Sequence, residues 1–113
     1  MNDDIRHPSV QTIREYLARQ YHLPAEQIES MLPSFLSTLR DHMDRLDKAL
    51  MDNDSLQAGK AAHTIKGAFL NLGLDECAEL ARIIEQSGKS AEKIEDLAPN
   101  VEKLRLKLNR ILN

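Results

Sequence analysis

Apolar side chains recur at steps of three or four residues along much of the chain, and this spacing restricts the possible fold more than any other feature. The longest series consists of Ile28, Leu32, Leu36, Leu39, Met43, Leu46 and Leu50. Because residues three and four apart share one face of an α-helix, the series predicts a long amphipathic helix with one buried stripe. No stretch shows the alternation of a half-buried strand. The sequence therefore predicts an all-α protein.

Two prolines are expected to interrupt the helices. Proline removes a backbone hydrogen bond inside a helix but suits a first turn. We therefore expect the main part of the second helix to span residues 33–51, beginning at Pro33 after a short turn that starts near Ala25. Pro99 predicts a kink or a restart in the last helix.

Capping residues predict the ends of the other helices. Asp54 can cap a third helix, which ends where Gly73 and its neighbours tolerate a left-handed backbone. Asp75 can cap a fourth helix, and Gly88 lies where a glycine would end it. The apolar stripe of the first helix consists of Val10, Ile13, Leu17 and Tyr21. That of the fourth helix consists of Cys77, Leu80, Ala81 and Ile84. That of the last helix consists of Ile94, Leu97, Val101, Leu104, Leu108 and Ile111.

These helices and their short links predict an antiparallel up-down-up-down four-helix bundle with an additional N-terminal helix. With 113 residues the chain can form one core but not two. We expect residues 25–113 to form the bundle. Residues 1–24 would be an N-terminal extension whose helix, at about residues 9–21, has a narrow apolar stripe and packs as an accessory.

Charge and hydropathy exclude several classes of partner. The formal net charge is −3, with both signs interspersed and no basic run, which argues against nucleic acid as a partner. No stretch approaches the roughly 20 apolar residues that cross a bilayer. Cys77 has no second cysteine to pair with, and the N-terminus lacks the pattern of a signal peptide. We therefore expect a cytoplasmic protein in which Cys77 is a small buried hydrophobe.

His63 is the candidate functional residue of the third helix. At about 100° per residue it points away from the apolar arc formed by Ala58, Ala61, Ile65, Ala68, Phe69 and Leu72. Its stacked neighbours at i−4 and i+4 are Gly59 and Gly67, so no side chain covers the ring. Each glycine costs a helix about 1 kcal/mol relative to alanine, and we interpret both as leaving access for a bulky partner.

An exposed imidazole can act as a nucleophile towards a phosphoryl group, because its neutral form keeps a lone pair on one ring nitrogen. Lys66 at i+3 and Lys60 at i−3 could approach the phosphoryl oxygens as point charges. Counting through a turn centred near Gly73 places His63 level with residues 83–85, and Glu85 lies at the margin of the fourth helix's apolar stripe, from which it could meet the ring. A carboxylate that accepts a hydrogen bond from Nδ1 would orient the ring and leave Nε2 free to react.

The surface around His63 is a candidate docking site. Leu56 and Leu70 fall on the His63 face rather than on the core arc, and with Gly59 and Gly67 they could form an exposed apolar patch. Such patches often mark binding sites.

Metal binding is not expected. Di-iron bundles need a glutamate three residues before a histidine, and neither His42 nor His63 has one. His7, His22 and His42 lie in polar contexts without paired spacing, so we interpret them as surface residues.

The stretch Ala62-His63-Thr64-Ile65-Lys66-Gly67-Ala68, followed by Asn71-Leu72-Gly73, Leu80 and Glu85, resembles the histidine-containing phosphotransfer (HPt) domain of multistep phosphorelays. The resemblance covers about residues 31–112. It implies that His63 accepts a phosphoryl group at Nε2 from a receiver-domain aspartate and passes it to another receiver. By this resemblance Lys66 corresponds to the family's assisting cation, and Gly67 corresponds to the small residue that lets the receiver approach. Glu85 is similar to an acid at that place in the phosphotransfer domain of the chemotaxis kinase.

The resemblance also implies a phosphocarrier rather than an enzyme. Its partners would be response-regulator receiver domains, including those of hybrid histidine kinases. Mg²⁺ would arrive with the receiver's acidic pocket, and the chain would hold no cofactor of its own. Many members of this family have a small residue at the position of Phe69. Because Phe69 lies on the apolar arc, we expect altered core packing there. We expect a monomer, and a stand-alone protein because the chain begins with Met1 and holds only this domain.

Two alternatives belong to other classes. One is the dimerisation and phosphoacceptor segment of a histidine kinase, which typically has an acidic residue after the histidine and a proline soon after; this chain has Thr64 and Gly67 in that region. The other is a helical interaction module that binds receiver or kinase domains without carrying phosphate. The sequence leaves this second alternative open.

Overall fold

A computed structural model describes residues 8–90 and 93–112 of the chain, and within these ranges every regular element is a helix. The five helices are α1 (Val10–Tyr21), α2 (Ala25–Met51), α3 (Ser55–Asn71), α4 (Asp75–Lys89) and α5 (Ile94–Leu112). The all-α prediction is confirmed. Of the predicted N-terminal extension, residues 1–7, including His7, lie outside the described ranges.

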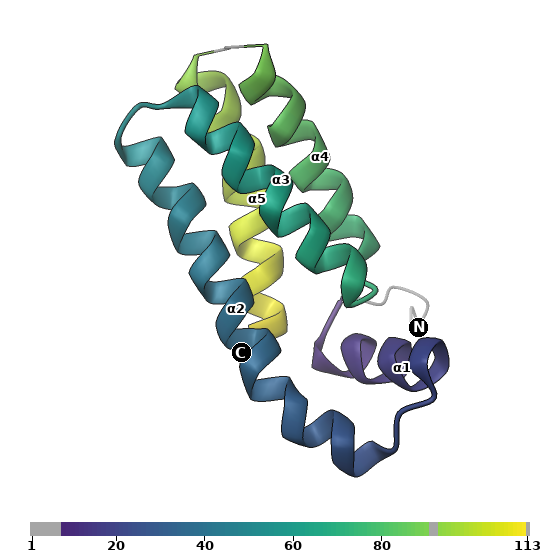
Figure 1. The fold of residues 1–113 in the computed structure, drawn as a ribbon. Helices are drawn as coiled ribbons and strands as arrows, with labels where there is room; N and C mark the ends of the chain where they lie inside the picture. Colours follow the sequence, from purple (N-terminus) through teal and green to yellow (C-terminus); the bar gives the residue numbers. More distant parts are fainter. Residues whose placement is uncertain (1–7, 91–92, 113) are drawn as a thin grey trace, which may run out of the picture.

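The helices form a bundle in which neighbours along the chain are also neighbours in space. α3 packs against α2 and α4, and α5 packs against α4 and α2 (Figure 1). α1 lies at the end of the bundle where α3 turns into α4 (Figure 1). Gly73 in that turn has φ +75°, and a Cβ there would collide with the ring of Tyr16. The accessory helix therefore covers the turn that joins α3 to α4.

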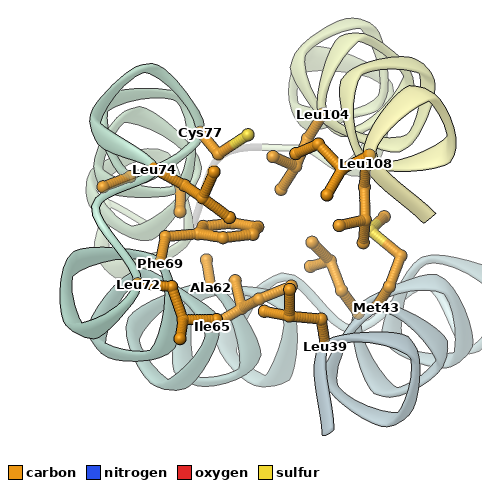
Figure 2. Close-up of a cluster of buried hydrophobic side chains, with 14 of the residues drawn as sticks. Leu39, Met43, Ala62, Ile65, Phe69, Leu72, Leu74, Cys77, Leu104 and Leu108 are labelled. Carbon is orange, nitrogen blue, oxygen red and sulfur yellow. The ribbon is translucent and has the colours of Figure 1, made fainter. Parts of the chain in front are cut away.

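The core is centred on Phe69. Its ring points into the space between the helices, where side chains of α2, α3, α4 and α5 meet (Figure 2). Phe69, Leu39, Cys77 and Leu104 are all completely buried. Phe69 therefore belongs to the core, as its place on the apolar arc predicted.

The prolines do not break the helices, so the predicted start of the main helix at Pro33 is wrong. α2 is continuous from Ala25 and bends in its lower part (Figure 1). Pro33 is exposed, while Leu32 beside it is buried. Packing of the apolar stripe stabilises the turns before the proline, and the missing hydrogen bond produces a bend rather than an end. α5 likewise continues through Pro99 without a restart.

The cap predictions are partly confirmed. Asp54 caps α3, and its carboxylate accepts a hydrogen bond from the backbone N–H of Gln57 at 3.0 Å. Asp75 is not the cap of α4 but its first helical residue. Its negative charge there still interacts favourably with the positive end of the helix dipole. Gly88 does not end α4, which continues to Lys89. Gly88 is buried because it packs against α3.

Candidate functional site

His63 projects from the exposed face of α3 and is held at one ring nitrogen. Its side chain is 67% exposed, and Nδ1 lies 2.7 Å from Oε2 of Glu85 on α4. No other residue of the described ranges forms a hydrogen bond with the ring. The sequence prediction that Glu85 reaches the ring agrees with this geometry. Nε2 is the ring nitrogen left to react with a partner.

Glu85 is a buried carboxylate with three cationic or polar partners. Its side chain is only 6% exposed. Lys66 Nζ donates to Oε1 at 2.7 Å, and Lys89 Nζ lies 3.3 Å from Oε2, the oxygen that also contacts His63. A buried charge is strongly unfavourable unless it is paired and hydrogen-bonded. The surrounding cations meet this requirement and keep Glu85 ionised.

The electrostatics of Glu85 fix the tautomer of His63. The pKa of Glu85 is lowered from 4.5 to about 2, mainly by the hydrogen bond from Lys66 and to a smaller extent by those with His63 and Lys89, while burial opposes the shift. An ionised carboxylate only accepts hydrogen bonds, so Nδ1 of His63 must carry the proton. In the neutral ring the lone pair is then on Nε2, the exposed nitrogen. The site presents an oriented nucleophile.

The lysines around His63 differ in their contacts. Lys66 is mostly buried and forms an ion pair with Glu85. In this structure it therefore acts on the His63 ring indirectly, through the carboxylate that contacts Nδ1. Lys60 is exposed, with no ion pair among the described residues. Lys89 was missed by the sequence analysis. The available signal was its position four residues after Glu85 on one helix, which places the two side chains on the same face.

The two glycines beside His63 have different surroundings. A Cβ on Gly67 would meet nothing within 4 Å, which agrees with the predicted access for a partner. Gly59 is buried, and a Cβ there would lie 3.2 Å from Cα of Gly88 and 3.3 Å from the carbonyl oxygen of Glu85. The close approach of α3 and α4, rather than access alone, explains a glycine at position 59.

A hollow of about 470 Å³ opens beside the ring, which we call the His63 hollow; it is lined by Leu56, Gly59, Lys60, His63, Thr64, Glu85 and Lys89. Leu56 is 59% exposed and Leu70 is 49% exposed, as predicted for the His63 face. The two leucines lie seven residues before and after His63, which is about 10 Å along the helix in each direction. Leu70 does not line the hollow itself.

Other candidate residues lie apart from this site. His42, expected at the surface, is half-buried, and its buried Nδ1 has no hydrogen-bond partner. Cys77 is completely buried, and burial raises the pKa of its thiol to about 11. Among the described residues there is no cluster of three or more histidine, cysteine or acidic side chains suited to a metal ion. None of the helices in the described part of the chain could cross a membrane.

The fold and site define a small all-helical protein that presents one oriented histidine on an open helix face. The family model of the Hpt domain matches residues 30–113, and the chain belongs to this family. Hpt domains are phosphocarrier modules of phosphorelays rather than enzymes, and they interact with response-regulator receiver domains. A search of curated proteins and a search of solved structures each found no match.

Proposed function

We propose that this protein is a histidine phosphocarrier in a two-component phosphorelay. His63 accepts a phosphoryl group from the aspartyl phosphate of one receiver domain and passes it to the aspartate of another. The observation that carries the proposal is the 2.7 Å contact between Nδ1 of His63 and buried Glu85, on a ring that is otherwise exposed. This contact leaves Nε2 as the attacking atom.

The transfer step balances without an added base. The Nε2 lone pair attacks phosphorus, the N–P bond forms, and the P–O bond to the receiver's aspartate breaks, so that the aspartate leaves as a carboxylate. The proton stays on Nδ1, and the phosphorylated ring gains a positive charge next to ionised Glu85. The carboxylate therefore stabilises the product ring electrostatically. Transfer to a second receiver is the reverse step.

The cations at the site serve the phosphoryl oxygens. Lys66 holds Glu85 in its ionised form, and its flexible side chain can also turn towards the oxygens when charge develops there. Lys60 and Lys89 are exposed on either side of the ring and add positive charge. Phosphorylation adds about −1.5 to −2 of charge, if the phosphoserine value applies to phosphohistidine, so these lysines favour the phosphorylated state.

The receiver docks on the face that carries His63. In this proposal Leu56 and Leu70 make apolar contacts and Lys60 makes a polar one. Gly67 leaves room beside the ring, and Gly59 contributes its backbone to the wall of the His63 hollow. Residues 25–113 form an antiparallel four-helix phosphotransfer domain and residues 1–24 an extension. The carrier acts as a cytoplasmic monomer without a cofactor of its own. Mg²⁺ comes with the receiver, which can belong to a hybrid histidine kinase.

The test is acid-labile, base-stable phosphate incorporation from a panel of receivers charged with acetyl phosphate. Label should appear in the wild type, disappear in His63→Gln and persist in the control His22→Asn, which alters an exposed histidine away from the site. Incubation with ATP alone should give no label; label under that condition would favour the kinase-segment alternative. Receiver binding without label on a folded protein would favour a non-phosphorylated interaction module.

A further inference from the structure

A second hollow lies between α2 and α3, and we call it the α2–α3 hollow. Its volume is about 370 Å³, and its lining includes His42, Arg45, Lys48, Asp52, Lys60 and Thr64. Lys60 and Thr64 also line the His63 hollow. The two hollows are therefore neighbours that share one ridge of α3, and His63 belongs to that ridge.

The charged groups of the α2–α3 hollow are mainly basic. Its one acidic lining residue, Asp52, is paired with Lys48 at 3.1 Å. Arg45 and Lys60 are exposed, and neither forms an ion pair with any residue in the described ranges. The whole chain has a net charge of −3, so this positive surface is a local feature. Such a surface complements an acidic one on a partner.

We propose that the α2–α3 hollow is a second docking contact, at which Arg45 and Lys60 bind acidic side chains of the receiver domain that covers His63. This inference rests on the proposed function. A protein that reaches Nε2 must lie over the ridge of Lys60 and Thr64, because Thr64 follows His63 directly and Lys60 lies one turn before it. The receiver surface beyond the ridge then faces Arg45 on α2.

The consequence is selection among receivers. Charge pairs at the edge of an interface mainly raise the association rate and disfavour partners of the wrong sign. Receivers with acidic residues on the surface that faces Arg45 would bind well, and receivers with basic residues there would be excluded. Within this contact Arg45 is separate from the chemistry, since Arg45 does not line the His63 hollow, whereas Lys60 lines both hollows.

The experiment compares Arg45→Glu with the matched control Arg40→Glu. Both arginines are exposed on α2, and the two variants change the net charge equally, but Arg40 does not line the hollow. Titration calorimetry measures binding of each unphosphorylated receiver in the panel. Rapid-quench kinetics measure phosphotransfer from the phosphorylated receiver. Arg45→Glu should weaken binding about tenfold and leave the transfer rate at saturating receiver unchanged, whereas Arg40→Glu should change binding less than about twofold.

Salt adds an independent readout. Raising NaCl from about 0.05 to 0.5 M should weaken wild-type binding more than binding of Arg45→Glu, because screening removes an attraction that the variant lacks. Equal effects of the two variants, or equal salt dependence, would overturn the proposal. A response of the Arg45 and Lys60 NMR signals to inorganic phosphate, with no effect of Arg45→Glu on receivers, would overturn it in favour of a small-anion site.

The outcomes separate this inference from the proposed function. Normal labelling of His63 in Arg45→Glu at every receiver concentration would refute the second contact and leave the phosphocarrier intact. Charge-dependent receiver binding without any labelling would refute the phosphocarrier and leave the second contact intact. If no receiver binds the folded wild-type protein, both are refuted.

Discussion

Gly88 on α4 lies directly against Gly59 on α3, one turn away from the contact between Glu85 and His63. A Cβ added to Gly88 would come within 2.6 Å of Cα of Gly59 and 2.8 Å of the carbonyl oxygen of Ser55. These are backbone atoms, so a side chain could fit only if the helices moved apart. The two glycines therefore set the separation of α3 and α4 one turn away from the place where the imidazole and the carboxylate meet.

Gly88→Ala should lower both stability and transfer. Overpacking at a close helix contact costs about 1–3 kcal/mol, and separation of the helices would lengthen the contact from Nδ1 to the carboxylate. Urea unfolding measures the first effect, and the ¹⁵N chemical shifts of the His63 ring measure the second. Wild-type stability together with wild-type ring shifts in Gly88→Ala would contradict the role assigned to this contact.

Gly67→Ala should have the opposite effect on stability. A Cβ at this position has open space around it, and alanine is better than glycine in a helix by about 1 kcal/mol. The thermal midpoint should therefore rise. Because the added methyl group lies on the docking face, receiver binding should weaken slightly, and Gly67→Leu should weaken it further without loss of stability. A fall in the midpoint for Gly67→Ala would show that the site is more crowded than the structure indicates.

Leu70→Asp should weaken receiver binding without unfolding the bundle. Leu70 is about half-exposed, so its replacement removes apolar area from the surface rather than from the core. Calorimetric titration of a receiver should show a loss of affinity of about tenfold or more, with the thermal midpoint nearly unchanged. Leu72→Asp is the matched control, because Leu72 is buried two residues away and its replacement should unfold the protein. Equal destabilisation by both variants would place Leu70 in the core.

The sequence predicted the helices well because their apolar stripes are long and regular. The stripe of α2 extends on both sides of Pro33, and its packing decided the outcome over the local preference of proline. Gly88 was misread for the same reason: a glycine near a helix end is usually a stop signal, but here the neighbouring backbone requires it. Pro33 and Gly88 show that a residue's local preference to start or end a helix does not decide the outcome where the helix packs against another one.

The site was predictable where chain geometry alone determined it. Counting residues through the tight turn at Gly73 placed His63 level with residues 83–85, and the structure brings His63 and Glu85 together. Lys66 was found from its spacing, but its ion pair with Glu85 was not, because the path of a long side chain depends on what is buried nearby. The surroundings of Arg45 could not be inferred either, since they depend on how α2 and α3 pack.

Glu85→Gln should slow phosphotransfer while the bundle stays folded. Glutamine keeps the shape of the side chain but removes the charge that fixes the Nδ1 proton and stabilises the phosphorylated ring. Loss of a residue that orients a reactive histidine typically costs about 10–100-fold, judged by the similar role of acids beside metal-bound histidines. Single-turnover transfer from a charged receiver measures the rate. Transfer at the wild-type rate would remove Glu85 from the mechanism.

The lowered pKa of Glu85 also predicts how stability depends on pH. Its pKa is about 2 in the folded protein against an ordinary value of 4.5, so the unfolded chain binds the proton more readily. The stabilisation from ionised Glu85 is therefore complete above about pH 4.5 and is lost as the pH falls towards about 2. Urea unfolding of the wild type and Glu85→Gln across this range measures the effect. The difference in unfolding free energy between the two should change with pH between about 2 and 4.5, in favour of the wild type as pH rises, because glutamine does not titrate. Parallel curves over the whole range would mean that Glu85 has the same pKa in the folded and unfolded states, and would contradict the effect assigned to the cations around it.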